Sequence, residues 1–95
     1  MKLEWDEAKR RANLKKHGLD FADTLAFAWE NAHVTLDDRI DYGEERQFAL
    51  GLYRGHVHVV VYVERGEARR IISFRKATSR EAKDWHEEEE EENRS

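Results

Sequence analysis

Cationic, titratable and aromatic side chains alternate along the second half of the chain. His56, His58 and Tyr62 lie an even number of residues apart in one run, as do Arg69 and Arg75 in the next. Side chains two residues apart in a β-strand share one face of the sheet. Arginine binds phosphate, tyrosine stacks on unpaired bases, and histidine transfers protons near neutral pH. Such a face suits single-stranded RNA, although a solvent-facing sheet with polar cross-strand pairs explains the same residues.

Three strand-like runs separated by short glycine-containing breaks position these side chains. They are Arg46–Tyr53, His56–Glu64 and Glu67–Arg75. Two-residue turns at Arg54-Gly55 and Arg65-Gly66 predict an antiparallel meander in which Tyr53 faces His56 and Glu64 faces Glu67. One face is then apolar, and it carries Phe48, Leu50, Leu52, Val57, Val59, Val61, Val63, Ala68, Ile72 and Phe74. On the opposite face Gly51, which has no side chain, is expected to leave an open floor, an uncovered patch of sheet, beside His58. A bulge in either hairpin would turn one strand over.

The remaining elements complete an α+β fold in the order β-α-α-β-β-β-β-α. The sequence predicts a strand at 2–5, a helix from Asp6 to about Lys16 that stops at Gly18, and a second helix from Asp20. A short strand at 33–37 and a polar loop at 38–45 follow. Thr78 and Glu81 match a capping box that starts a last helix. The apolar stripe of Phe21, Leu25 and Trp29 is expected to pack the two N-terminal helices on the apolar face of the sheet.

Charge divides the chain into a body and a tail. The net charge is −4, but residues 1–86 carry 16 Lys and Arg against 15 Asp and Glu, while residues 87–92 are all Glu. We therefore expect one domain at 1–86, followed by an acidic tail or helix extension at 87–95. The chain has no cysteine, no apolar run as long as a membrane span and no secretory signal. These features predict a cytoplasmic protein that does not contact membranes.

Three segments together resemble the BrnT toxin family, over roughly residues 2–86. The first is Trp5-Asp6-x-x-Lys9-x-x-x-Asn13-x-x-Lys16-His17-Gly18; the second is Glu45-Arg46, followed by a strand and Gly51; the third is Arg70-Ile71-Ile72-Ser73-x-Arg75-Lys76-Ala77-Thr78, followed by Glu81. The third is the most specific. Phe74 and Trp85 depart from the family pattern, which commonly has a small residue and a tyrosine there, and the Glu tract lies outside it.

The resemblance implies a RelE/ParE-like fold and a metal-independent ribonuclease that arrests translation and growth. It also implies a BrnA-like antitoxin with a ribbon-helix-helix part as partner, and contact with operator DNA only through the toxin–antitoxin complex. RNA would be the substrate. A non-catalytic homologue that only binds its antitoxin and co-represses, and a ParE-like gyrase inhibitor, remain alternatives because fold does not determine function.

Candidate residues follow from the resemblance and the inferred face. Arg75 and Lys76 are expected to clamp the phosphate, so Arg75→Ala should relieve growth arrest. Because Arg75 is expected to be exposed, the same change should leave thermal stability nearly unchanged. Arg70 and Arg46 fall on the apolar face, where they act in catalysis, pair with acids such as Glu7 or Asp23, or lie at an uncovered end of the sheet. His58 is the expected general base or acid, and RNA contacts are assigned to Arg69, Tyr62 and His56. The His56-x-His58 pair lacks a third ligand, so we expect no cofactor and no metal site.

Overall fold

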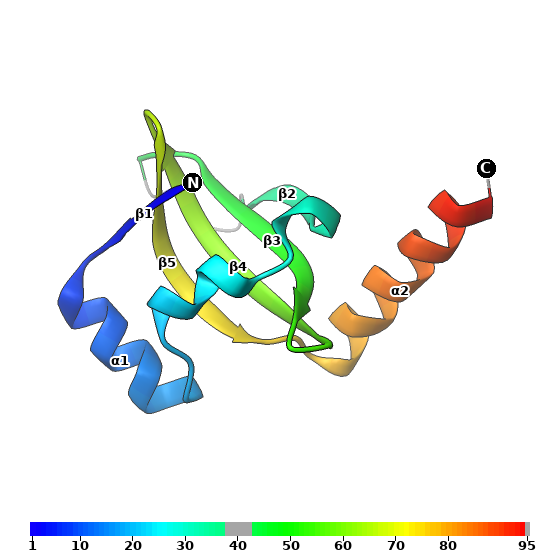
Figure 1. The fold of residues 1–95 in the computed structure, drawn as a ribbon, viewed down its shortest axis with the longest axis horizontal. Helices are drawn as coiled ribbons and strands as arrows, with labels where there is room; N and C mark the ends of the chain where they lie inside the picture. The colour runs from blue at the N-terminus through cyan, green and yellow to red at the C-terminus, as the bar shows by residue number, and fades with distance from the viewer. Residues whose placement is uncertain (38–42, 95) are drawn as a thin grey trace.

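A five-stranded sheet forms the centre of the computed structural model, which describes residues 1–37 and 43–94 (Figure 1). Its strand order is β1-β5-β4-β3-β2. The strands are β1 (Lys2–Trp5), β2 (His33–Asp37), β3 (Arg46–Tyr53), β4 (His56–Arg65) and β5 (Ala68–Lys76). The helical elements are α1 (Glu7–His17), the 3-10 segments η1 (Phe21–Ala26) and η2 (Trp29–Asn31), and α2 (Ser79–Arg94). The element order agrees with the sequence prediction, and the predicted polar loop at 38–45 falls largely outside the described residues.

The sheet is mixed, so the expectation of a purely antiparallel sheet was wrong. β2, β3, β4 and β5 pair antiparallel in sequence, but β1 pairs parallel to β5 at the edge. A parallel pair needs a crossover of a dozen or more residues, and here everything from α1 to β4 lies between the two strands. Their pairing could not be read from local turn signals.

Local capping chemistry sets the ends of α1 as predicted. Asp6 accepts a hydrogen bond from the Lys9 amide at 3.2 Å, and Gly18, with φ of 70°, donates to the Leu14 carbonyl. The helix then stops, and Asp20 caps the next segment by accepting from the Ala22 amide.

The second helix is not the continuous α-helix that the stripe predicted. It consists of η1 and η2, and Leu25 is 65% exposed. A 3-10 helix has three residues per turn, so side chains four apart do not stay on one face. Phe21 and Phe27 enter the core while Leu25 points to solvent.

The 3-10 segments cover the face of the sheet that was expected to be open (Figure 1). Their core partners on the sheet are Ala49, Tyr53, Val60, Tyr62, Ile71 and Phe74. At Gly51 a Cβ atom would lie 2.7 Å from Cζ of Phe27. The open floor predicted at Gly51 is therefore filled by the Phe27 ring, and the expected packing of Val57, Val59, Val61, Val63 and Ile72 under the second helix is wrong.

A β-bulge in β5 reverses the face of the sheet on which each following side chain lies. Val61 pairs with Ser73 but Tyr62 pairs with Ile71, so Ile72 is an extra residue. The turn itself is also one residue later than predicted, since Arg65 pairs with Ala68. Beyond the bulge, Phe74 joins Val60 on the core face, whereas Arg75 lies opposite Val59 on the other face.

Helix α2 lies on that other face. Arg75 contacts Glu81 of α2, and Trp85, 5% exposed, donates a hydrogen bond from Nε1 to the Asn31 carbonyl at 3.3 Å. All seven residues from Val57 to Val63 are buried, so β4 is covered on both faces. Among the described residues, no helix is both long and apolar enough to cross a membrane.

Candidate active site

Tyr62 does not lie on an open surface as the sequence suggested. Its side chain is 3% exposed and packs edge-to-face against Trp29, with ring centroids 5.2 Å apart. The Arg69 guanidinium lies 4.5 Å from the Trp29 ring centroid and 5.1 Å from that of Tyr62. Tyr62 therefore has no free ring face for a base, and Arg69 already stacks on aromatic rings within the fold.

A pocket at one end of the sheet gathers the two strand histidines with cationic side chains. It has a volume of about 260 Å³, and its lining residues are Leu19, Tyr53, Arg54, His56, His58 and Lys76. The β3–β4 turn supplies Arg54, with φ of 51°, beside Gly55, with φ of 79°. Two positive φ values suit the tight hairpin turn that the sequence predicted there. Lys76 reaches this pocket because the bulge puts it opposite His58.

His58 is held in one orientation by its neighbours. Its Nδ1 lies 2.8 Å from the His56 carbonyl oxygen, and its ring contacts Tyr53 and Phe74 at centroid distances of 5.1 and 5.7 Å. Because a carbonyl only accepts, we assign the proton to Nδ1, which leaves the Nε2 lone pair available. Burial is the main cause that lowers the pKa of His58; the hydrogen bond to the His56 carbonyl opposes it, and the nearby charges of His56 and Lys76 lower it further. A neutral imidazole with an available lone pair is the form that a general base needs.

Arg75 pairs with a residue of α2 and is not among the residues that line this pocket. Nη1 and Nη2 lie 2.8 and 2.9 Å from the two carboxylate oxygens of Glu81, a bidentate pair. Its side chain is 25% exposed and lies on the other face of the sheet, opposite Val59, so the expectation of an exposed Arg75 on the His58 face was wrong. Glu81 also accepts from the Thr78 amide, and Thr78 Oγ1 accepts from the Glu81 amide, which confirms the capping box. Together these contacts lower the pKa of Glu81 to about 2, with the Arg75 hydrogen bond as the largest cause.

Arg70 and Arg46 lie away from the pocket. Arg70 pairs loosely with Glu4 of β1 at 3.9 Å, and not with Glu7 or Asp23. Arg46 is half-buried, and its strand position is opposite Asp37 of β2. Neither is brought to His58, so the structure does not gather all the predicted catalytic residues into one site.

A groove between α1 and β5 adds cationic residues that the prediction left out. It has a volume of about 250 Å³, and Lys9, Lys16 and His17 line it together with Asn13, Ile72 and Ser73. Burial, Lys16 and Arg75 lower the pKa of His17. The signal was present in the sequence, because residues 9, 13, 16 and 17 lie at i, i+4, i+7 and i+8 and so share one helix face.

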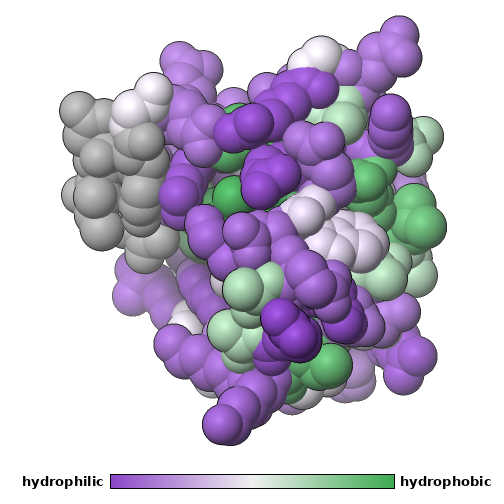
Figure 2. Space-filling model, turned by 90° about the vertical axis from the view of Figure 1, so that its left-hand side faces the viewer, coloured by the Kyte–Doolittle hydropathy of each residue, from purple (hydrophilic) through white to green (hydrophobic). Residues whose placement is uncertain are grey.

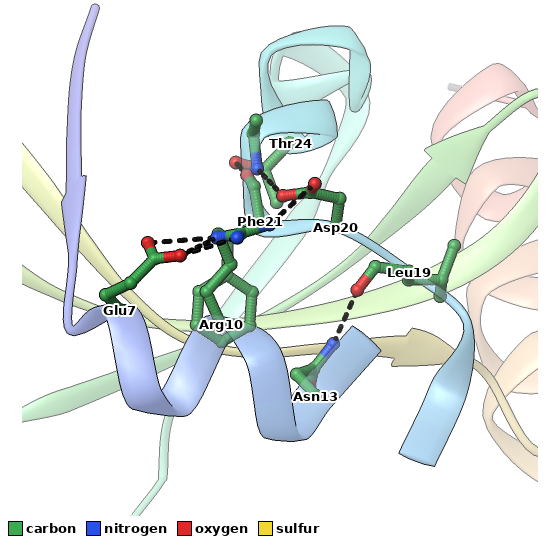
Figure 3. Close-up of polar contacts among 8 residues, drawn as sticks. Glu7, Arg10, Asn13, Leu19, Asp20, Phe21 and Thr24 are labelled. Atoms are coloured by element: carbon green, nitrogen blue, oxygen red, sulfur yellow. Dashed lines mark hydrogen bonds and ion pairs between the residues drawn. The ribbon is translucent and has the colours of Figure 1, made fainter. Parts of the chain in front are cut away.

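Polar side chains hold α1 in place beside this groove. Asn13 accepts from the Phe74 amide at 3.2 Å and donates to the Phe74 and Leu19 carbonyls. Arg10 bridges Glu7 and Asp20, as Figure 3 shows, and its hydrogen bond to Glu7 raises its pKa. The α1 side of the molecule is mostly hydrophilic at its surface (Figure 2).

Comparison with known proteins identifies the family. The family model described as "Ribonuclease toxin, BrnT, of type II toxin-antitoxin system" matches residues 5–81. The chain belongs to the BrnT family. Among solved structures, the Brucella abortus ribonuclease toxin BrnT, determined at 1.1 Å resolution, is similar with a TM-score of 0.66 and 38% identity. That match covers 83% of this chain and 99% of the Brucella chain. No curated protein matches the sequence.

The family match shows which elements of the chain the family model includes and which lie beyond it. It includes α1, strands β2 to β5 and the α2 capping box, and it runs from Trp5, the last residue of β1, to Glu81. The BrnT-family resemblance seen in the sequence is thus confirmed, and the Glu tract lies beyond the matched residues. In this chain that tract continues α2 as helix to Arg94.

Proposed function

We propose that this BrnT-family protein is a metal-independent endoribonuclease whose cleavage centre is the sheet-end pocket. The observation that carries the proposal is His58, a neutral imidazole with an available Nε2 in a pocket lined by Lys76, Arg54 and His56. The family description as ribonuclease toxins supplies the reaction class. A base and several cations in one pocket are what phosphodiester cleavage by an RNA 2′-hydroxyl requires.

In this mechanism Nε2 of His58 removes the 2′-hydroxyl proton. The 2′ oxygen then bonds to the adjacent phosphorus and the bond from phosphorus to the 5′ oxygen breaks, giving a 2′,3′-cyclic phosphate. Lys76 and Arg54 neutralise the charge that develops on the phosphate oxygens. His56, exposed at the pocket, provides a second titratable group that protonates the leaving 5′ oxygen.

The RNA backbone would continue from the pocket along the α1 groove. His17 lines the groove, Leu19 lines the pocket, and only Gly18 separates them in the sequence. Lys9 and Lys16, which both line the groove, would contact phosphates on the one side of the scissile bond that enters it. This path replaces Tyr62 and Arg69 as the RNA-binding surface, and it leaves Arg75 to position Lys76 through its pair with Glu81.

We also propose the partners that the BrnT resemblance implies. A BrnA-like antitoxin with a ribbon-helix-helix part would neutralise the toxin, and the complex would contact operator DNA through the antitoxin. Growth and translation arrest in the cytoplasm, and a RelE/ParE-like relationship of the fold, belong to the same proposal.

Cleavage of a labelled RNA in EDTA tests the catalytic assignment. His58→Ala should slow cleavage roughly 10²- to 10⁴-fold, the contribution expected of one positioned proton transfer. Lys76→Ala should also slow it strongly. His86→Ala and Arg80→Ala are matched controls, because both residues are exposed on α2, outside the pocket, and both should cleave at the wild-type rate.

Other results of these experiments would each support a different function. Cleavage by His58→Ala at the wild-type rate would reject His58 as the base. A wild-type chain that cleaves no RNA yet binds its antitoxin would indicate the non-catalytic homologue, and altered plasmid supercoiling on induction would indicate a gyrase inhibitor.

A further inference from the structure

A histidine and several glutamates converge where the extra length of α2 passes the start of β2. His33 is the first residue of β2, with a side chain 15% exposed. Its Nδ1 lies 2.6 Å from Oε2 of Glu88, and its Nε2 lies 3.0 Å from Oε1 of Glu89. The Trp85 ring packs against the imidazole at a centroid distance of 5.8 Å. The imidazole is therefore held facing Glu88 and Glu89, which lie beyond the residues that the family model matches.

The donor atoms are already close to the spacing of metal ligands. One ligand atom each from His33, Glu89 and Glu92 lie within 4.8 Å of one another. Glu89 and Glu92 are three residues apart and share one face of α2. Ligands of a tetrahedral zinc ion, bonded at about 2.0–2.2 Å, lie roughly 3.4 Å apart, so small side-chain rotations would complete the set. A pocket of about 280 Å³, lined also by Glu30, provides space for the ion and a water ligand.

Glu88 lies beside the other ring nitrogen of His33. Metal-binding histidines commonly donate their other ring N–H to a carboxylate, which fixes the tautomer and turns the free nitrogen to the metal. Oε2 of Glu88 lies 2.6 Å from Nδ1, but this contact lacks hydrogen-bond geometry, so in the metal-free protein the ring is held by the hydrogen bond of 3.0 Å between Nε2 and Glu89. A metal ion bound by Nε2 would replace that hydrogen bond and leave Nδ1 to donate to Glu88.

Charge also favours a cation here. Glu30, Glu89 and Glu92 line the pocket, and Glu88 contacts the same imidazole. Among the described lining residues, His33 carries the one basic side chain. We propose that His33, Glu89 and Glu92 bind a divalent transition-metal ion such as Zn²⁺, with Glu88 orienting the imidazole. The nitrogen donor favours Zn²⁺ over Mg²⁺, which prefers an all-oxygen octahedral shell.

Such an ion would fasten the distal half of α2 to β2. It would play no part in RNA cleavage, because the site lies on α2 and β2 while the catalytic pocket is formed by β3, β4 and β5. The proposal does not rest on the ribonuclease proposal.

Calorimetric titration of the full-length, EDTA-stripped protein with ZnCl₂ tests the site. We expect one equivalent to bind, and the Tm to rise by about 10 °C when zinc is about 100-fold above its Kd. MgCl₂ at the same concentration should leave the Tm unchanged. Co²⁺ in place of Zn²⁺ should give the visible absorption of a tetrahedral site.

Variants locate the binding. His33→Ala and Glu89→Gln should each weaken zinc binding at least tenfold, and Glu88→Gln should weaken it about tenfold with unchanged stoichiometry. Glu91→Gln is the matched control, since it removes the same charge from the opposite side of the helix. His56→Ala controls for zinc bound by the strand histidines. If His33→Ala does not fold, Glu89→Gln carries the test, because it keeps the size of a side chain that is 22% exposed.

The proposal is overturned by a wild-type protein whose Tm does not respond to zinc. It is also overturned if Glu89→Gln binds zinc as tightly as Glu91→Gln does, since the ion would then lie elsewhere and the His33 contacts would be simple ion pairs.

Discussion

Replacing Glu81 by Gln should measure what the Arg75–Glu81 clamp contributes to stability. Glutamine keeps the length of the side chain and can still accept from the Thr78 amide, as capping boxes with Gln do. The substitution therefore removes mainly the charge that faces Arg75, whose nitrogens lie 2.8 and 2.9 Å from the carboxylate.

The pKa of Glu81 sets the upper limit of the effect. A fall from 4.5 to about 2 corresponds to about 3 kcal/mol of interaction that favours the ionised form. The Arg75 and Glu81 side chains are 25% and 22% exposed, so solvent screens part of it. We expect Glu81→Gln to lower the free energy of unfolding by about 1–2 kcal/mol at pH 7, and the Tm by about 5–10 °C.

Urea unfolding as a function of pH is the assay. The lowered pKa means that Glu81 stabilises the folded state fully above pH 4.5 and that this contribution is lost as the pH falls from 4.5 toward about 2. The difference between wild type and Glu81→Gln should shrink over that window. Adding Arg75→Met completes a double-mutant cycle, in which we expect a coupling energy of about 1 kcal/mol.

Two results would refute this reasoning. A coupling energy indistinguishable from zero would mean that Arg75 and Glu81 are not paired in solution. A difference between wild type and Glu81→Gln that stays constant down to pH 2 would mean that the charge of Glu81 is not what stabilises α2. Cleavage measured on Arg75→Met shows whether Arg75 also acts on RNA, as the sequence suggested.

Three further predictions follow from other parts of the molecule. Gly51→Ala should cost about 1–3 kcal/mol in urea unfolding, because its Cβ would lie 2.7 Å from the buried Phe27 ring, and an unchanged midpoint would contradict the packing. The kcat/KM for RNA cleavage should fall on the acidic side with a midpoint below pH 6.5. The reason is that the base must be neutral and that burial lowers the pKa of His58. A midpoint above pH 6.5 would exclude His58 as the base. Deleting residues 87–95 changes the net charge from −4 to +1. RNA binding should then become tighter at about 10 mM salt but hardly change at 150 mM, where the Debye length is about 8 Å. Unchanged affinity at low salt would refute screening by the Glu tract.

Local signals in the sequence determined both ends of α1, the start of α2 and the β3–β4 turn. Asp6, Gly18, Thr78 and Glu81 cap helices through contacts within four residues, and the Arg54-Gly55 turn sets the β3–β4 register through its own backbone angles. Such interactions need no information from distant parts of the chain. The motif resemblance to the BrnT family depended likewise on residue types at set spacings.

Tertiary packing alone decided which face of the sheet is covered and which catalytic candidates meet. β4 is apolar on both faces, so alternation could not show that Phe27 would fill the space above Gly51 and bury Tyr62. One extra residue, Ile72, reverses the faces on which the side chains at the end of β5 lie. As a result Lys76 lies opposite His58, and Arg75 pairs with Glu81. A bulge depends on how three strands and the α2 contacts fit together, and these contacts join residues distant in sequence. The types of group available for chemistry could thus be predicted from the sequence, but their grouping into a site required the folded sheet.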